Sequence, residues 1–460
     1  MRSKQFLAVV VCAALFAMPS FAQSTADLTA LEGLAPVSVL PLTTEGVAAL
    51  AANYTVTGGI QTGTIRQATL MPFAEQQQQA LRDAAITGGN LEQLADGLGT
   101  SLGSAYIARA HYADQQHFTN ISQAVADVIS YSTATTQADS GSAKYFFANG
   151  TTDGKTPVTT VATSILKGNG GETDVFGKSY GLLAGSAGAD AYGDSRPFQT
   201  EPSVLPIVGP DFFNVPASNA VYNRGPIMNL INSPSYPSGH TTYGYTGALL
   251  LAILVPDRYQ EMIVRGAEYG NDRIIMGAHY AMDVLGGRTL ALYDMARLLA
   301  NDPAYIGQTR KGKPSITDFQ AALKRARIDV ANTLTVACGK SVRECAREDT
   351  SRFSNPAADE AFYAETQTYN LPVVYPKNAS SVEDVSKIAP EAGYLLTSAF
   401  PGLTLEQADH ILTDTEGPGG GFLDNGSAFG LYSRLNLYLA AARASVVINL
   451  ASGFSRERGF

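Results

Sequence analysis

Three short segments of the chain combine residue types that could bind and transfer an anionic group. The sequence has only five histidines, and two of them fall in these segments. Histidine is the side chain best suited to exchange protons or attack an electrophile near neutral pH. The segments are Arg196-Pro197, then Ser235-Tyr236-Pro237-Ser238-Gly239-His240, and then Arg273 followed by His279 and Asp283.

The second segment has the composition of an anion site at the start of a helix. Ser238 and Gly239 directly precede an apolar helical pattern that begins near His240. The first amides of a helix lack intrahelical acceptors, and the helix dipole favours negative charge there. Gly239 would let the backbone approach an anion closely. Taken alone, the segment is equally typical of a turn in which Ser238 caps the helix.

The third segment pairs an imidazole with a carboxylate. His279 and Asp283 are four residues apart, so on a helix they share one face. A carboxylate in that position can fix the imidazole tautomer and leave the other nitrogen free to attack or to ligate. Arg273 adds a permanent charge suited to a phosphate-like group. The alternative is a buried histidine with an ordinary helix partner and an arginine in a surface ion pair.

In this order, the three segments resemble the signature of the type 2 phosphatidic acid phosphatase and vanadium-dependent haloperoxidase superfamily. That superfamily includes the bacterial class A non-specific acid phosphatases. The resemblance covers roughly residues 190–290. It implies a mainly α fold, a helical bundle, in agreement with the helical patterns of this sequence.

The resemblance also implies a role for each matching residue. His279 would be the nucleophile that forms a phosphohistidine, and Asp283 would orient it. His240 would protonate the leaving group and then activate water. The phosphoryl oxygens would be held by Arg196, Ser238, Gly239 and Arg273.

Two positions depart from the signature. The superfamily has a lysine seven positions before its first arginine, where this chain has Ala189. Either Lys178 reaches the site through an insertion, or the site lacks that cation. Asp272 replaces a serine next to Arg273, and we expect its carboxylate to face away from the site.

The function implied is an exported phosphomonoesterase acting on small phosphate esters. Phosphoryl transfer depends mostly on positioning and charge stabilisation, so fixed arginines and amides would suffice without a metal cofactor. The scheme needs His279 neutral while His240 is protonated, so we expect their pKa values to differ. The alternatives are a vanadium haloperoxidase with vanadate as cofactor, a lipid phosphate phosphatase at a membrane surface, and a binding protein on a degenerate scaffold.

The N-terminus is typical of a signal peptide. Arg2 and Lys4 precede an apolar stretch from Phe6 to Met18, and a small-x-small cleavage site ends at Ala22. This stretch is too short to span a bilayer, which takes about 20 residues, so we expect no stable membrane insertion. The mature protein would be periplasmic or secreted.

Composition narrows the class of partner. The formal net charge is −9, and removal of the signal peptide would make it −11. Such an acidic chain is not a nucleic-acid-binding protein, because phosphate-backbone affinity needs clustered Lys and Arg. Cys338 and Cys345 are predicted to form a disulfide if the protein is exported, with a pair of free buried thiols as the alternative. The sequence is compatible with a homo-oligomer as well as a monomer.

Hydrophobic periodicity gives the expected organisation. Glycine, serine, threonine and aspartate are frequent over residues 135–200, which predicts loops or short strands there. The Gly-rich segment 417–422 predicts a turn. The expected divisions are a signal peptide (1–22), an extended or irregular N-terminal arm (23–75), a helical phosphatase-like domain (76–350) with its active site within 190–290, and a C-terminal helical appendage packed on the core (351–460).

Overall fold

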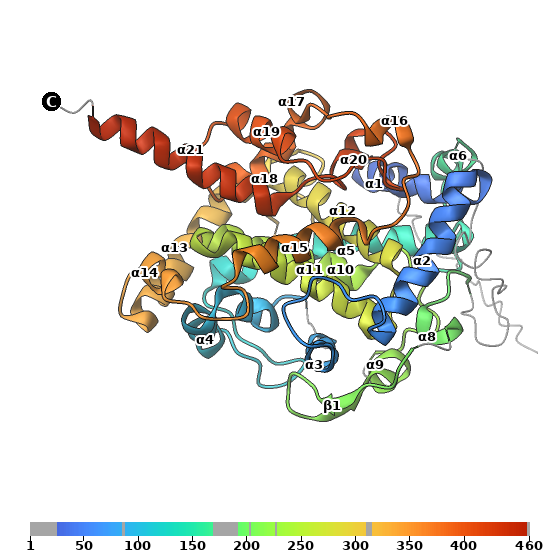
Figure 1. Ribbon diagram of the computed structural model, residues 1–460, viewed down its shortest axis with the longest axis horizontal. Coiled ribbons are helices and arrows are strands. Elements are labelled where there is room, and N and C mark those ends of the chain that lie inside the picture. Colours follow the sequence, from blue (N-terminus) through green and yellow to red (C-terminus); the bar gives the residue numbers. More distant parts are fainter. Residues whose placement is uncertain are drawn as a thin grey trace, which may run out of the picture.

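The fold is mainly α, as the sequence predicts. The computed structural model describes residues 25–84, 88–168, 192–201, 204–225, 228–309 and 315–457. Within these ranges the strands are one short antiparallel pair, β1 (Val208–Pro210) and β2 (Pro216–Ser218), in which Val208 pairs with Ser218. The outer helices pack around a small group of buried helices at the centre of the structure (Figure 1).

The helices fall into three stretches of the chain, with 3₁₀ helices labelled η. The first comprises α1 (Thr25–Leu34), η1 (Ala35–Leu42), α2 (Thr44–Thr62), α3 (Phe73–Asp83), η2 (Glu92–Leu98), α4 (Thr100–Arg109), α5 (Gln123–Asn149) and α6 (Thr160–Gly168). The second comprises α8 (Pro197–Thr200), α9 (Asn219–Arg224), α10 (Gly239–Leu254), η3 (Pro256–Arg258), α11 (Tyr259–Ile275), α12 (Ala281–Leu299) and α13 (Phe319–Cys338). The third comprises α14 (Val342–Arg347), α15 (Pro356–Thr368), α16 (Pro376–Ala379), α17 (Val385–Ile388), η4 (Pro390–Gly393), α18 (Tyr394–Thr397), α19 (Leu405–Asp414), α20 (Ala428–Leu431) and α21 (Leu437–Glu457).

Helix α10 lies at the centre of the core. It contacts α5, α11 and α12, and nearly all of its residues are buried. A helix that is apolar on every side is stable only inside such a bundle. Close packing depends on Gly244, because a methyl group there would lie 2.0 Å from the ring of Tyr269 on α11.

The start of α10 is joined directly to the start of α12. The amide of Ser238 donates to the carbonyl of Asp283 at 2.9 Å. A methyl group on Gly287 would lie 2.4 Å from the Ser238 carbonyl oxygen, so only glycine permits this approach. The Ser-Gly-His segment and the His-Asp segment are therefore neighbours in space.

The N-terminal region differs from the expected extended arm. Residues 25–62 form α1, η1 and α2, and apolar residues of these elements such as Leu34 and Val37 are fully buried. Helix α2 caps α12: Ala281 N donates to Thr57 Oγ1 at 3.0 Å, and Met282 N donates to Asn53 Oδ1 at 2.9 Å. The hydrophobic pattern of α2 is weak because its buried face includes polar residues, Asn53 and Thr57, which accept these hydrogen bonds.

Helix α5 is the second difference, because it crosses into the region expected to be loop or strand. It continues to Asn149 and ends at Gly150, whose φ of 69° is left-handed. Thr136 and Ser140 are buried in it, and Thr246 of α10 donates to the Thr136 hydroxyl at 3.2 Å. The polar composition of this stretch therefore reflects packing against α10 and not a loop.

The C-terminal helices α15, α18 and α21 pack on α11 and α12 (Figure 1). The Gly-rich segment forms a turn, as predicted, in which Gly420 has a φ of 78° and its amide donates to Asp424. Cys338 and Cys345 form the predicted disulfide at the junction of α13 and α14.

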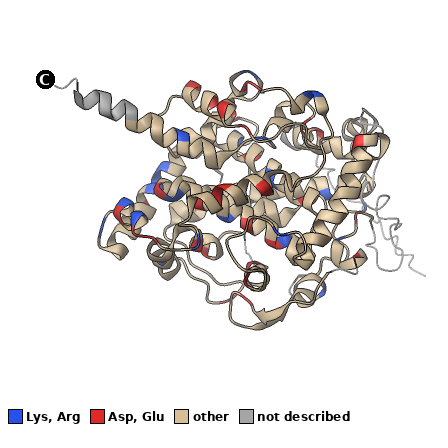
Figure 2. Ribbon diagram, in the orientation of Figure 1, with Lys and Arg blue, Asp and Glu red and all other residues tan. Residues whose placement is uncertain are grey.

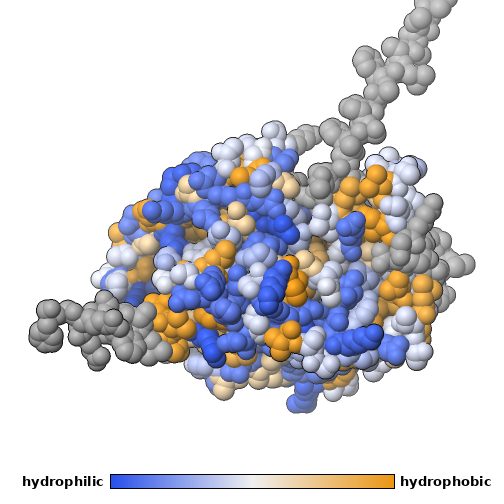
Figure 3. Space-filling model, turned by 90° about the horizontal axis from the view of Figure 1, so that it is seen from above, coloured by the Kyte–Doolittle hydropathy of each residue, from blue (hydrophilic) through white to orange (hydrophobic). Residues whose placement is uncertain are grey.

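The surface carries no single dominant patch on the faces in view. Acidic and basic residues are intermixed along the helices (Figure 2), and several separate apolar patches interrupt a mainly hydrophilic face (Figure 3). Among the described residues, no single helix is long and apolar enough to cross a membrane. One pair of segments, Leu28–Leu42 and Thr44–Thr62, meets the length and composition test only when combined across a 98° bend.

Candidate active site

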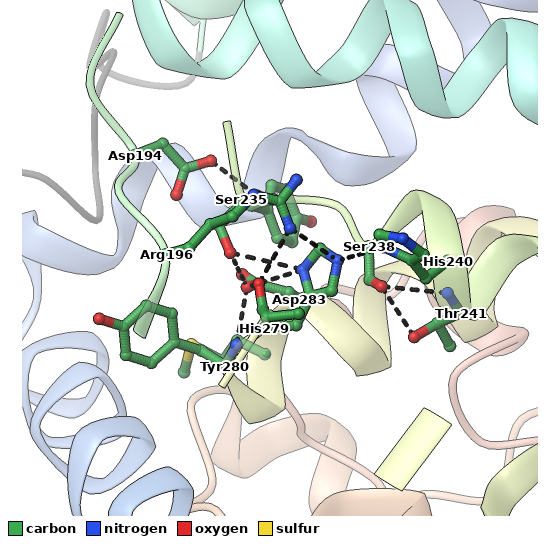
Figure 4. A network of polar contacts seen from close by, with 12 residues as sticks. Asp194, Arg196, Ser235, Ser238, His240, Thr241, His279, Tyr280 and Asp283 are labelled. Carbon is green, nitrogen blue, oxygen red and sulfur yellow. Dashed lines mark hydrogen bonds and ion pairs between the residues drawn. The ribbon is translucent and has the colours of Figure 1, made fainter. Parts of the chain in front are cut away.

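The fold brings together five of the seven predicted site residues around one imidazole (Figure 4). His279 lies between α11 and α12, and its side chain is fully buried. Its neighbours come from the segment before α8, the start of α10 and the first turn of α12. These neighbours are Arg196, Ser238, His240 and Asp283.

The contacts of His279 define its tautomer. Nε2 lies 3.0 Å from Nη1 of Arg196, and Nδ1 lies 3.3 Å from Oδ2 of Asp283. A guanidinium has donors only, so Nε2 must accept with its lone pair. The ring proton is then on Nδ1, facing the carboxylate. His279 therefore presents an unprotonated, oriented Nε2, which is the form needed for nucleophilic attack.

Asp283 is held by donors from two sides. Its Oδ2 accepts from the Tyr280 amide at 2.8 Å and from the Ser235 hydroxyl. Burial raises the pKa of this carboxyl to about 6, while the hydrogen bonds from Ser235 and Tyr280 lower it. The carboxylate form, which is the one that orients His279, is therefore the main form above about pH 6.

Arg196 is fixed by backbone carbonyls and is only 1% exposed. Nε donates to Ser233 O at 2.7 Å, Nη1 to Ala278 O at 2.9 Å, and Nη2 to Pro234 O at 3.0 Å. Carbonyls orient the guanidinium without neutralising its charge. A buried cation of this kind beside Nε2 is suited to stabilise negative charge on a transferring group.

The N-terminus of α10 faces the same point. Ser238 is the N-cap, and its Oγ accepts from Thr241 N at 3.1 Å and from Thr241 Oγ1 at 2.8 Å. With two donors on its oxygen, the Ser238 hydroxyl still has its own proton to donate. The carbonyl of Gly239 accepts from Gln137 Nε2 of α5 at 2.9 Å, which fixes the first peptide of the helix. The helix end that the sequence predicts to bind an anion therefore has a fixed first peptide and a serine hydroxyl with its proton available.

His240 contacts His279 directly. Its Nδ1 lies 3.2 Å from Nε2 of His279, and its Nε2 lies 3.0 Å from the sulfur of Met228. Burial lowers the pKa of both histidines, and the nearby Arg196, Arg273 and Lys144 lower both further. Both pKa values are therefore shifted in the same direction, because both rings meet the same cations. A bound dianion beside His240 would supply the opposite charge that raises its pKa.

Arg273 is buried nearby, but its side chain contacts neither histidine directly. Nη2 donates to Ala80 O at 2.9 Å, and the guanidinium lies 4.9 Å from the centre of the Tyr269 ring. After burial, the positive charge of Arg273 is nevertheless the largest cause of the lowered His240 pKa. Arg273 therefore acts on the two histidines through its positive charge.

The sequence led us to expect that the Asp272 carboxylate faces outward. This prediction was wrong, because Asp272 is only 1% exposed. Burial raises its pKa well above the usual range, and the neighbouring carboxylates Asp83 and Glu268 raise it further. A protonated Asp272 carries no charge. It therefore leaves the positive field of Arg273 intact.

Three residues at the site were not assigned a role from the sequence. Ser235 bonds Asp283, and Asp194 accepts from the amides of Ser235 and Tyr236 at 2.9 and 2.7 Å. Lys144 of α5 donates to Pro234 O at 2.8 Å. Lys144 could have been found only by reading residues 135–149 as a helix, which places Gln137, Ser140 and Lys144 on one face.

The two positions left open by the sequence, Ala189 and Lys178, lie outside the described residues. Within the described ranges, no group of three or more His, Cys, Asp or Glu side chains is arranged to hold a metal ion.

Comparison with known proteins finds similarity in the part of the chain that contains the site. Residues 183–300 match the PAP2 superfamily. A non-specific acid phosphatase of Salmonella typhimurium is 43% identical over 91 residues, which are 20% of this chain and 36% of the relative. An acid phosphatase of Zymomonas mobilis is 47% identical over 64 residues, covering 14% of this chain and 24% of the relative. A non-specific acid phosphatase of Providencia stuartii is 38% identical over 84 residues, covering 18% and 34%.

These matches span about a third or less of the relatives' own length. The PAP2 match nevertheless contains all seven residues predicted to form the site, from Arg196 to Asp283, whereas Lys144 lies outside it. The similarity of this chain to the PAP2 superfamily, predicted from three short motifs, is thereby confirmed for residues 183–300.

Proposed function

We propose that this protein is an exported phosphomonoesterase of the acid phosphatase type. The observation that carries the proposal is the state of His279, whose Nε2 is kept unprotonated by Arg196 while Nδ1 faces Asp283. The acid phosphatase names of the partly matching relatives agree with it.

The first step forms a phosphohistidine. Nε2 of His279 attacks phosphorus, the bond from phosphorus to the ester oxygen breaks, and protonated His240 gives its proton to the leaving alkoxide. Arg196 and the start of α10 stabilise the charge on the non-bridging oxygens. Because His240 Nδ1 is 3.2 Å from Nε2, the His240 ring must turn aside when the phosphoryl group enters.

The second step returns the enzyme to its starting state. His240 takes a proton from water, the resulting hydroxide attacks phosphorus, and the bond to Nε2 breaks to release inorganic phosphate. Asp283 stabilises the positive charge that His279 carries while Nε2 is phosphorylated. The proposed reaction uses no metal cofactor, because fixed cations and amides neutralise the transferring group.

Export is part of the proposal. The N-terminal segment has the pattern of a signal peptide, although it lies outside the described residues. The Cys338–Cys345 disulfide supports an oxidising compartment such as the periplasm. Detection of the protein in a periplasmic or secreted fraction, with Gln23 as its first residue, would test this assignment.

The chemical test is hydrolysis of p-nitrophenyl phosphate without added metal, with mass spectrometry after an alkaline quench to detect the phosphoenzyme. The wild-type protein should turn over and be inhibited by vanadate, whereas His279→Ala should neither turn over nor become phosphorylated. His240→Ala should accumulate the phosphoenzyme, because p-nitrophenolate leaves without an acid but hydrolysis lacks its base. Turnover by His279→Ala would exclude this nucleophile. Bromination by peroxide after vanadate loading, without phosphatase activity, would instead assign a haloperoxidase.

A further inference from the structure

We propose that Lys144 of α5 binds a non-bridging oxygen of the phosphoryl group together with Arg196. This inference rests on the proposed phosphatase function and deepens it. Lys144 lies outside the segment that matches the PAP2 superfamily. It is also remote in sequence from the three motifs that define the rest of the site.

The first observation is a shared acceptor. Nζ of Lys144 donates to Pro234 O at 2.8 Å, and Nη2 of Arg196 donates to the same oxygen at 3.0 Å. The ammonium and the guanidinium therefore lie side by side. Pro234 also directly precedes Ser235, so the shared carbonyl belongs to the segment that leads into the start of α10.

The second observation is how α5 meets the start of α10. A methyl group on Gly239 would lie 3.3 Å from Cε of Lys144 and 3.3 Å from Oγ of Ser140. Gln137, one helical turn before Ser140, holds the Gly239 carbonyl. One face of α5 therefore forms a wall beside the peptide that is expected to approach the anion.

The third observation is an unused donor in this wall. Ser140 is fully buried, and its hydroxyl has no hydrogen-bond partner among the described residues. Buried hydroxyls nearly always have a partner, so one without a partner beside an anion site indicates where a ligand oxygen or its bound water would be placed. The α5 wall thus offers a donor and a cation toward the same space.

The charge of Lys144 reaches the reacting groups. It is among the causes that lower the pKa of His279, of His240 and of Asp283. A third cation beside Arg196 and Arg273 favours a ligand with two negative charges. The site should therefore prefer phosphate monoesters, which are dianions above about pH 6, to singly charged diesters.

Lys144 would also compensate for the lysine that is missing at position 189. The resemblance places a lysine there, and this chain has Ala189. A cation from α5 would supply the same charge by a different route.

The experiment compares Lys144→Met with Lys155→Met, which removes the same charge from an exposed position just after α5. Lys144→Met should raise the KM for p-nitrophenyl phosphate and the inhibition constant of inorganic phosphate about tenfold or more. Lys144→Arg should recover part of the loss, and Lys155→Met should behave as wild type. If Lys144→Met lowers the Tm, Lys144→Gln removes the charge while keeping a donor for Pro234.

Unchanged KM and phosphate inhibition in Lys144→Met would overturn the inference while leaving the phosphatase assignment in place. If the wild-type protein hydrolyses no phosphate ester, the proposed function fails. Calorimetric titration of wild type and Lys144→Met with inorganic phosphate then tests the anion site alone, and equal affinities would overturn the role of Lys144.

Discussion

Nη1 of Arg196 lies 3.0 Å from Nε2 of His279, although the two residues are 83 positions apart in the sequence. This contact selects the tautomer of the imidazole, because an arginine can only donate. It also places a permanent positive charge where a phosphoryl group would bond to the ring. In the proposed reaction the same residue would prepare the nucleophile and stabilise the charge that develops.

Arg196→Lys should therefore lower kcat/KM about 100-fold, since lysine cannot reproduce the fixed donors of the guanidinium. Steady-state hydrolysis of p-nitrophenyl phosphate measures the effect. Arg224→Lys is a matched control, because Arg224 is exposed and donates to the carbonyl of Phe198 in the adjoining helix α8. Wild-type kcat/KM in Arg196→Lys would contradict the role given to this side chain.

Ser235→Ala should move the acid limb of the kcat/KM pH profile upward by about one pH unit. The Ser235 hydroxyl donates to Asp283 and lowers the pKa of that carboxyl, which burial raises to about 6. Without this donor the pKa of Asp283 rises further, so the ionised form that orients His279 appears at higher pH. Ser235→Thr keeps the hydroxyl and should restore the profile. A lower kcat with an unmoved limb would show that Ser235 only packs.

The folded protein should be more stable near pH 5 than near pH 8. Burial raises the pKa values of Glu92, Asp359, Asp409 and Glu416 to about 7. A raised folded pKa gives stability that is present below the unfolded value and is lost as pH rises through the folded value. His240 and His279 act in the opposite sense, because their lowered pKa values cost stability as pH falls below about 6.5. The carboxyls are more numerous, so the Tm should fall between the two pH values.

Thermal unfolding of wild type and Asp409→Asn checks the pH dependence of stability. Asparagine does not titrate, so the variant should lose part of the slope of Tm against pH. A Tm that rises from about pH 5 to about pH 8 would show that these carboxyls are not protonated in the folded state.

Removal of the disulfide should cost stability but not activity. Cys338 and Cys345 are seven positions apart, and a loop this short corresponds to roughly 2 kcal/mol in the chain-entropy relation. The bridge joins α13 to α14, and α14 contacts α4 and η3, which carry no site residue. The double variant Cys338→Ser, Cys345→Ser should have a lower free energy of unfolding and an unchanged kcat/KM. A selective loss of kcat/KM would link this bridge to the site.

The sequence was sufficient to predict the mainly α class and the neighbours of His279. Those residues lie at helix starts, where caps are local signals: Ser238 caps α10, and Asp283 is in the first turn of α12. The prediction that His279 and Asp283 share one helix face was wrong, because α12 begins at Ala281 and His279 lies just before it. Local signals do not report where a side chain points across the fold. Arg273 therefore turned out to bond Ala80, and Asp272 turned out to be buried.

The contribution of α5 could not be predicted because its composition suggests a loop. Threonine, serine and aspartate favour turns when they are exposed, but Thr136 and Ser140 are buried against other helices. Their helical conformation is imposed by tertiary packing. The same reason explains α2, whose Asn53 and Thr57 are buried to cap another helix.

The joint between Ser238 and Gly287 has a consequence for redesign. It fixes the start of α10 to the helix that carries Asp283, so these parts cannot be reshaped independently. Met228, which contacts Nε2 of His240, belongs to neither of these helices. Libraries intended to admit bulkier esters should therefore vary Met228 and its neighbours and leave the glycine joint unchanged.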